Sequence, residues 1–169
     1  MAEIQRTYYN DGKLKTEVFV LNNKKHGEYK EYHESQDGNI GPLRIICNYI
    51  DDNINGEYKS YYPSGQLEEI SYYKDGKKNG EFKQYYPSGQ LMKIYNYIND
   101  MINGEYKEYY PSGQLMKIYN YINDMINGEY KEYYPSGQLM KICNYINNYK
   151  NGEYKKYNED GELIKQMNY

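Results

Sequence analysis

The sequence contains no tryptophan, two phenylalanines, two histidines and two cysteines. No apolar run approaches the roughly 18 residues that a membrane-spanning helix needs, so we expect no transmembrane segment. The histidines lack the paired spacing of a zinc motif. The Ser-Gly-Gln segments lack the glycine-rich run and the following Lys-Ser/Thr of a phosphate-binding loop. These absences argue against a transmembrane protein, a zinc enzyme and a nucleotide-binding enzyme.

A large net charge is also missing, because 24 acidic and 21 basic residues are interleaved and leave a formal charge of −3. No strong field therefore attracts nucleic acid or anionic lipid. Lysines interleaved with tyrosines suggest stacking on single-stranded nucleic acid. However, nearly every lysine of the first predicted strand has a glutamate beside it, and binding to phosphate chains requires a positive excess. We expect no nucleic-acid partner.

The first residues, MAEIQRTYYNDGK, have no apolar stretch of the kind found in a secretory signal, so we expect an intracellular, cytoplasmic protein. Abundant Asn, Ile and Lys, which AT-rich codons encode, indicate a low-GC genome such as that of a giant DNA virus, a parasite or a low-GC bacterium. For a virus, the expected location is the host cytoplasm or the viral factory.

What the sequence has in abundance is tyrosine, 27 residues, arranged in a tandem repeat. One pattern recurs every 24 residues and is clearest as GEYKEYYPSGQLMKIYNYINDMIN at 104–127. Between Gly27 and Gly56 the period is 29, because five extra residues lie between Tyr32 and Leu43. Near-identical tandem blocks build a surface rather than a single asymmetric pocket.

We predict one repeat domain, residues 1–169, of about seven copies. The copies are an N-terminal partial copy at 1–26, a copy with an enlarged turn at 27–55, regular copies at 56–79, 80–103, 104–127 and 128–151, and a C-terminal capping copy at 152–169. Cys47 and Cys143 occupy one repeat position, four copies apart. At about 4.8 Å per strand they would lie roughly 40 Å apart, so we expect free thiols and no disulfide.

Each copy is predicted to form a β-hairpin, because tyrosine and isoleucine favour strands and no stretch has a helical apolar stripe. Pro-Ser-Gly-Gln forms the first turn, and Asn103-Gly104 and its equivalents mark the second. The structural turn glycines are Gly65, Gly89, Gly113 and Gly137 in the first turn and Gly56, Gly80, Gly104, Gly128 and Gly152 in the second. The predicted fold is all-β, an elongated, twisted single antiparallel sheet of tandem hairpins.

The hairpin register follows from side-chain chemistry. A four-residue loop at 111–114 sets three pairs opposite one another, namely Tyr110 with Leu115, Glu108 with Lys117, and Tyr106 with Tyr119. A three-residue loop would set Lys107 opposite Lys117, two like charges, so we favour the four-residue loop. In that register one face carries Tyr106, Tyr110, Leu115, Tyr119 and Tyr121, and the other carries Tyr109, Met116, Ile118 and Ile122.

The recurring GEYKxYYPSGQLMKI pattern, with variants YYNDGKLKTE at 8–17 and YNEDGELIK at 157–165, resembles the variant form of the MORN repeat. That resemblance implies tandem Gly- and Tyr-containing hairpins in an extended sheet, with structural roles for Gly56, Tyr58, Tyr61, Tyr62, Gly65, Leu67 and their equivalents. Such repeats occur alone in unassigned viral and bacterial proteins, some labelled antitoxin-like, and elsewhere as accessory modules of enzymes. The enlarged turn at 33–42 departs from the pattern.

Few residues are candidates for chemistry, and we expect no catalytic residue, metal or cofactor. His26 replaces the Asn that precedes Gly in other copies, which favours a role in a turn. His33 lies at the enlarged turn with Glu31, Glu34 and Asp37 nearby, where a metal is the alternative to a structural role. Cys47 and Cys143 replace the tyrosines of other copies and have no histidine close in sequence to activate them as nucleophiles.

The favoured function is therefore a non-catalytic scaffold that binds a protein partner. The candidate partner-binding residues are Tyr106, Tyr109, Tyr130, Tyr133, Glu108 and Glu132. For most of the tyrosines the favoured role is structural, with rings stacked between copies, and for the repeated charges the favoured role is a solvated face. Alternative functions are an antitoxin-like regulator of a partner enzyme and a module that binds phospholipid head groups at a membrane surface. Exposed sheet edges, around 163–169 in particular, suggest an edge-to-edge homodimer.

Overall fold

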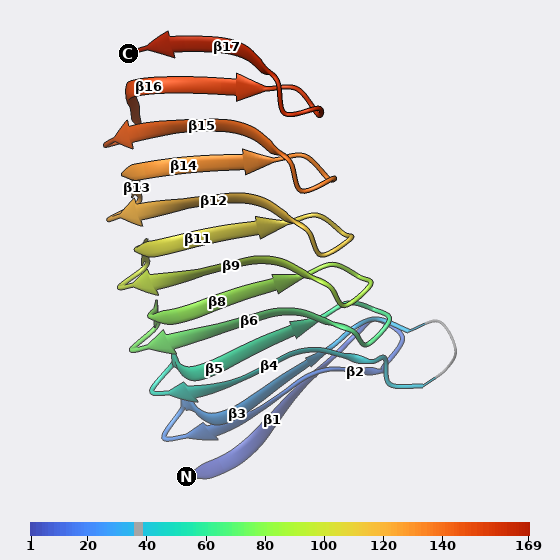
Figure 1. Ribbon diagram of the computed structural model, residues 1–169. Helices are drawn as coiled ribbons and strands as arrows, with labels where there is room; N and C mark the ends of the chain where they lie inside the picture. The colour runs from blue at the N-terminus through green and yellow to red at the C-terminus, as the bar shows by residue number, and fades with distance from the viewer. Residues whose placement is uncertain (36–38) are drawn as a thin grey trace. The chain divides into compact units, whose positions relative to one another are not determined.

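The computed structural model describes residues 1–35 and 39–169. Across these residues the chain forms no helix, and its seventeen strands belong to one antiparallel sheet of tandem hairpins (Figure 1). The predicted all-β fold is confirmed. No helix in the described part of the chain is long and apolar enough to cross a membrane.

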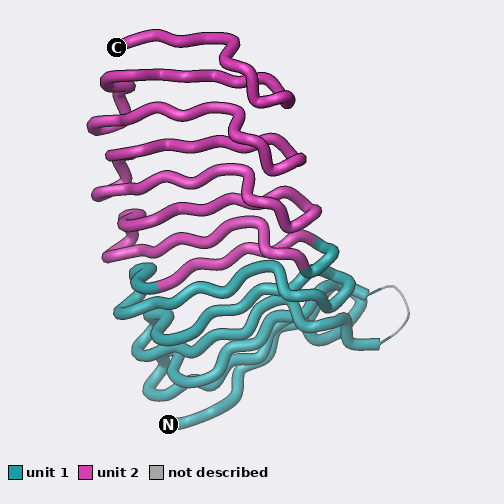
Figure 2. Tube along the Cα trace, in the orientation of Figure 1, with its two compact units in different colours: residues 1–80, 87–89 teal, residues 81–86, 90–169 magenta. Residues whose placement is uncertain are grey.

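The chain divides into two compact units, which Figure 2 colours separately. Unit 1 consists of residues 1–80 and 87–89, and unit 2 of residues 81–86 and 90–169. The strands in unit 1 are β1 (Ala2–Tyr8), β2 (Leu14–Leu21), β3 (Lys24–Tyr32), β4 (Leu43–Ile50), β5 (Asn53–Tyr61), β6 (Leu67–Lys74) and β7 (Lys77–Lys78). The next strand, β8 (Gly80–Tyr85), begins at the last residue of the first segment of unit 1. The strands of unit 2 that follow it are β9 (Leu91–Ile98), β10 (Met101–Ile102), β11 (Gly104–Tyr109), β12 (Leu115–Ile122), β13 (Met125–Ile126), β14 (Gly128–Tyr133), β15 (Leu139–Ile146), β16 (Tyr149–Tyr157) and β17 (Leu163–Asn168).

The first turn of each hairpin lies where the sequence predicts it. The amide of Gly113 donates to the Tyr110 carbonyl at 2.8 Å, and the Tyr110 amide donates to the Gln114 carbonyl at 2.9 Å. Gly113 has a φ of 86°, in the left-handed region that glycine adopts at little cost. The equivalent glycines, Gly65, Gly89 and Gly137, also have φ between 83° and 88°.

The second turn lies four residues earlier than predicted. Asn123 and Asp124, with φ of 50° and 62°, form the two-residue connection between β12 and β13, and two consecutive left-handed residues are typical of a type I′ turn. The prediction of a turn at Asn103-Gly104 was wrong. Asn and Asp tolerate the left-handed region because their short polar side chains hydrogen-bond locally.

The glycines assigned to that second turn lie at the start of a strand or inside one. They are Gly56, Gly80, Gly104, Gly128 and Gly152. In β16, Cys143 is opposite Tyr154 while the adjacent Asn144 is opposite Asn151, so Gly152 and Glu153 form a β-bulge. Glycine at this position supplies the positive φ of the bulge rather than that of a turn.

The hairpin register is partly as predicted. Glu108 lies opposite Lys117 and Tyr106 opposite Tyr119, but Leu115 lies opposite Tyr109 rather than Tyr110. A register shift between Glu108 and Tyr109 leaves Met116 as an extra residue in β12. The shift moves Leu115 to the other face of the sheet, because side chains alternate along a strand.

The two faces of unit 2 differ in character. Paired residues share a face, so the face bearing Tyr106, Glu108, Lys117 and Tyr119 we call the stack face. The opposite face carries three sets of paired residues, and we call it the groove face. These pairs are Tyr109 with Leu115, Lys107 with Ile118, and Glu105 with Asn120.

The core of unit 2 is a row of aromatic rings on the stack face. Ring centroids are separated by 4.5 Å from Phe82 to Tyr95, 5.1 Å to Tyr106, 4.7 Å to Tyr119 and 5.0 Å to Tyr130. The planes are inclined by only 21° to 24°. A second tyrosine meets the row edge-on at Phe82, through Tyr97, and at Tyr106, through Tyr121, while Tyr145 is tilted by 58° to Tyr130. The stacking of tyrosines between copies, predicted as their structural role, is present here.

Both cysteines occupy the repeat position at which Tyr95 and Tyr119 contribute a stacked ring. Cys143 lies opposite Tyr130 and packs with Tyr154, where Tyr119 stands in the preceding repeat. In unit 1, Cys47 lies between Tyr29 and Tyr58. Both thiols are buried and free, and burial raises the pKa of Cys47 to about 11 and also raises that of Cys143. Thiols with raised pKa are poor nucleophiles at neutral pH.

Candidate partner-binding face

A ladder of tyrosine hydroxyl groups joins successive repeats beside the first turn. The hydroxyl of Tyr86 donates to the Tyr109 carbonyl at 2.8 Å, that of Tyr110 to the Tyr133 carbonyl at 2.8 Å, and that of Tyr134 to the Tyr157 carbonyl at 2.9 Å. In unit 1, Tyr9 makes the same bond to Tyr32. Each bond therefore fixes the backbone of the tyrosine that accepts it. In unit 2 these include Tyr109 and Tyr133, whose side chains lie on the groove face.

His33 belongs to this ladder and stands where other copies have the donating tyrosine. Its Nε2 lies 2.8 Å from the Tyr61 carbonyl oxygen, which only accepts hydrogen bonds, so Nε2 carries the proton. Among the described residues no cluster of His, Cys, Asp and Glu could hold a metal ion. Asp37, which the metal alternative included, lies outside the described residues.

Removing one hydroxyl from the ladder should weaken the sheet measurably. We expect Tyr110→Phe to lower the free energy of unfolding by about 0.5–1.5 kcal/mol, the usual net contribution of one hydrogen bond. Urea unfolding followed by circular dichroism measures this change. Tyr133→Phe, whose ring lines an open groove, is the matched control and should change stability less. Equal losses in both variants would contradict a structural role for the Tyr110 hydroxyl.

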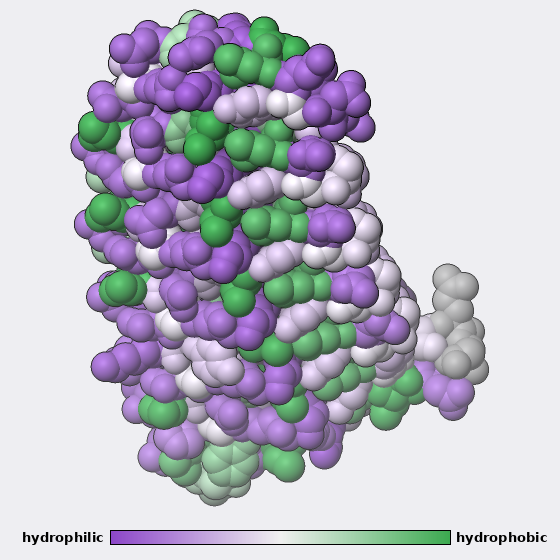
Figure 3. Space-filling model, in the orientation of Figure 1, coloured by the Kyte–Doolittle hydropathy of each residue, from purple (hydrophilic) through white to green (hydrophobic). Residues whose placement is uncertain are grey.

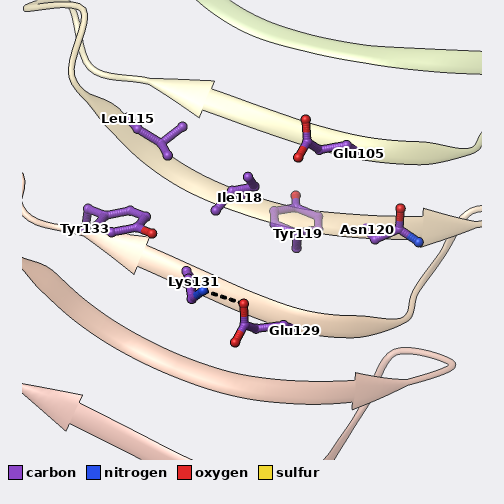
Figure 4. Close-up of a pocket in the computed structure, with 8 residues that line it drawn as sticks. All are labelled: Glu105, Leu115, Ile118, Tyr119, Asn120, Glu129, Lys131 and Tyr133. Carbon is purple, nitrogen blue, oxygen red and sulfur yellow. Dashed lines mark ion pairs between the residues drawn. The ribbon is translucent and has the colours of Figure 1, made fainter.

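A groove of about 330 Å³ crosses the groove face between β12 and β14 (Figure 4). Its lining residues are Glu105, Leu115, Ile118, Tyr119, Asn120, Glu129, Lys131 and Tyr133. A second groove, of about 230 Å³, lies one repeat earlier and is lined by Glu81, Ile94, Tyr95, Asn96, Glu105, Lys107 and Tyr109. Seven of the lining positions are related by a shift of 24 residues, so the same groove occurs twice in unit 2.

In Figure 4, Leu115 lies beside Tyr133 in a first row, and Ile118 lies beside Lys131 in a second row. Glu129 lies next to Lys131, its ion-pair partner, and Asn120 lies farther along β12, beyond Tyr119. Because Tyr109 pairs with Leu115 and Tyr133 with Leu139, the first row alternates an aromatic ring with an aliphatic side chain along successive strands. Figure 3 shows the matching bands of apolar and polar surface on unit 2.

The charges of the groove face are paired within each repeat. Lys107 Nζ lies 2.5 Å from a Glu105 carboxylate oxygen, and Lys131 lies 2.5 Å from Glu129. The hydrogen bond to Glu105 raises the pKa of Lys107. The glutamate side chains are 56% and 52% exposed and both lysines are 32% exposed, so the carboxylates are the more accessible members.

The six candidate binding residues divide between the two faces. Tyr109 and Tyr133 line the grooves. Tyr106 and Tyr130 are buried in the aromatic row on the stack face. Glu108 and Glu132 also lie on the stack face, where Lys117 and Lys141 pair with them. Leu115 was not predicted as a groove residue, because its side chain reaches the face of Tyr109 only through the bulge at Met116.

This arrangement defines an all-β repeat protein whose hairpins stack tyrosines on one face and repeat a shallow groove on the other. The model of the MORN repeat variant family matches residues 4–22, 54–75, 78–99, 102–123, 126–147 and 150–169. The chain therefore belongs to the MORN repeat variant family, in general a non-enzymatic repeat module. Residues 23–53, which include most of the copy with the enlarged turn, lie outside the matched segments, although β3 and β4 pair as the other hairpins do.

No curated protein matches the chain. Among solved structures, one described as the GtfA/B complex bound to UDP and GlcNAc is similar over 85% of this chain, at 11% identity and a TM-score of 0.22. One described as TcdB2-TccC3-Cdc42 is similar over 98% of this chain, at 14% identity and a TM-score of 0.22. This chain spans 24% and 12% of those chains, respectively.

Proposed function

We propose that this protein is a non-catalytic scaffold that binds a protein partner on the groove face of unit 2. The observation that carries the proposal is the recurrence of one groove, with the same side chains, in successive repeats. An open, repeated groove suits an extended ligand that contacts several repeats, whereas small-molecule sites enclose most of their ligand. Tyr109 and Tyr133 supply rigid aromatic contacts of the kind that concentrate binding energy at interfaces.

The stack face is less suited to the same task. Tyr106 and Tyr130 are covered on both sides by neighbouring rings or by Lys141, whose Nζ lies 4.7 Å from the Tyr130 centroid. Contact with a partner would require these rings to leave the core. We therefore assign the interface to the face of Tyr109 and Tyr133.

A double variant tests this assignment. We expect Tyr109→Ala with Tyr133→Ala to weaken partner capture by at least about thirtyfold, the cost of losing one interface hot spot or more. The fold should survive, since both rings line open grooves. Tagged protein expressed in its native cell, followed by quantitative mass spectrometry, measures the captured partner.

The matched control changes the other face. Glu108→Gln with Glu132→Gln keeps side-chain volume on the stack face and should leave capture unchanged. Capture that survives the tyrosine variant, or that fails only in the glutamine variant, would refute the groove face as the interface. Circular dichroism of both variants separates lost binding from lost folding.

A further inference from the structure

The spacing of the grooves restricts what shape of ligand can fit them repeatedly. Successive grooves are two strands apart, which at about 4.8 Å per strand gives about 9.6 Å. A polyproline II (PPII) helix has three residues per turn and rises about 3.1 Å per residue, so equivalent side chains recur about every 9.3 Å on one side. The two periods differ by only about 0.3 Å per repeat.

Other peptide conformations fit this spacing less well. In a β-strand, three residues span about 10 Å, but alternate side chains point to opposite sides, so residues i and i+3 cannot enter the same row. In an α-helix the closest match is seven residues, which span about 10.5 Å and accumulate an error of nearly 1 Å per groove. PPII is therefore the regular conformation that presents one residue per groove.

The side chains of the first row match the chemistry of a PPII ligand. Tyr109, Leu115, Tyr133 and Leu139 alternate ring and aliphatic surface along successive strands. Proline-rich PPII segments dock into aromatic-lined grooves of this type, and the conformation is already formed before binding, which limits the entropy lost. The backbone carbonyl groups of a PPII segment have no internal hydrogen-bond donors. Asn120 donates one side-chain N–H to the Tyr121 carbonyl, and its second N–H can donate to a carbonyl of the ligand.

The charges specify the residues between the prolines. Glu105 and Glu129 lie near the start of β11 and β14, away from the turn at which Leu115 and Tyr133 lie, and their side chains are more exposed than those of the lysines that pair with them. A basic side chain on the ligand, directed along the strands, would meet one carboxylate in each repeat. An acidic side chain there would meet like charge. The pairs with Lys107 and Lys131 are neutral overall, and because the glutamates are their more exposed members, the accessible charge of the groove face favours a basic ligand.

From these observations we propose that unit 2 binds a proline-rich, basic segment of a protein partner in the PPII conformation, running across the strands with one proline in each groove. This proposal rests on the proposed scaffold function and specifies its partner. The expected partner segment has proline at every third position and Arg or Lys between the prolines.

Binding of synthetic peptides to the full chain tests the proposal. The probe is a fluorescein-labelled peptide of about 12 residues, four PPII turns, with proline at every third position and arginine after each proline. Its matched control has the same composition with the prolines at irregular spacing. We expect the periodic peptide to bind at least about tenfold more tightly in fluorescence anisotropy, and Tyr109→Ala with Tyr133→Ala to remove that preference.

Peptide length provides a second readout. Affinity should rise as the periodic peptide is lengthened until its turns match the grooves. A variant lacking residues 104–127, one whole repeat, should reach its plateau with a peptide shorter by about three residues, one PPII turn. Circular dichroism verifies that this variant is folded. A plateau at the same length in both proteins would overturn the alignment of turns with repeats.

The same data separate this inference from the scaffold function. Equal binding of the periodic and irregular peptides, or no binding of either while a cellular partner still requires Tyr109 and Tyr133, overturns PPII recognition and leaves the scaffold intact. Failure of the cellular partner to require these tyrosines overturns the scaffold assignment on this face. Replacing arginine by glutamate in the periodic peptide should abolish binding, and unchanged binding would contradict the charge complementarity.

Discussion

Replacing Tyr106 by alanine is expected to lower the free energy of unfolding by about 3–5 kcal/mol, the range typical of truncating a large buried aromatic residue. The Tyr106 ring is 8% exposed and lies 5.1 Å from the Tyr95 ring and 4.7 Å from the Tyr119 ring. Its edge contact with Tyr121 would also be lost. Because the chain contributes few other buried side chains to unit 2, the cavity has little around it that can collapse inward.

The matched control is Tyr106→Phe. Phe82 occupies the equivalent position one repeat earlier, 4.5 Å from the Tyr95 ring, so the site accepts a ring without a hydroxyl. We expect this variant to lose about 1 kcal/mol or less. Urea unfolding of the parent protein and both variants, followed by circular dichroism, gives the comparison. If alanine proved as mild as phenylalanine, the aromatic row would not be the core of unit 2.

Much of the fold was predictable because the same local sequence signals recur in several copies. Local chemistry is enough to predict the Pro-Ser-Gly turn, the strands rich in tyrosine and the pairing of Glu108 with Lys117. The second turn was misplaced because two signals compete there. Asn-Gly is a strong turn signal, but the chain turns at Asn123-Asp124 and uses Gly128 next to the bulge. Both Asn123-Asp124 and Asn127-Gly128 tolerate the left-handed region. The pairing between strands decides which of them forms the turn, and the sequence of a single copy does not contain this information.

The functional face was harder to predict than the fold. Tyr106 and Tyr109 belong to the same strand and the same residue type, yet one is buried in the stack and the other lines a groove. Alternation along β11 alone puts them on opposite faces, but which face packs depends on what lies opposite. Tyr106 meets Tyr119 and Tyr109 meets Leu115, and the second pair exists only because Met116 is bulged out of register.

Raising the pH above about 10 is expected to unfold the protein steeply, because the core rings are phenols that must stay protonated to remain buried. Burial raises the pKa of Tyr106, Tyr119 and Tyr130 above the usual value, with nearby Glu108 or Glu132 adding to the effect at Tyr106 and Tyr130. In unit 1, burial raises the pKa of Tyr58 to about 12. Between the unfolded and the folded pKa, the unfolded chain has released protons that the folded chain still holds. Stability is therefore complete below about pH 10 and falls as the pH rises.

Three such phenols lower the free energy of unfolding by about 4 kcal/mol per pH unit within this window. Urea unfolding at several values between about pH 8 and about pH 11.5 spans the ordinary tyrosine pKa and measures the slope. Lysines also titrate in this range, and loss of the Lys107–Glu105 pair lowers stability in the same direction. Tyr106→Phe isolates the phenol, since it keeps the lysines and the ring and should reduce the slope by about 1.4 kcal/mol per pH unit. Identical slopes in the parent and the variant would show that Tyr106 ionises as freely in the folded protein as in the unfolded chain, which is incompatible with a buried aromatic row.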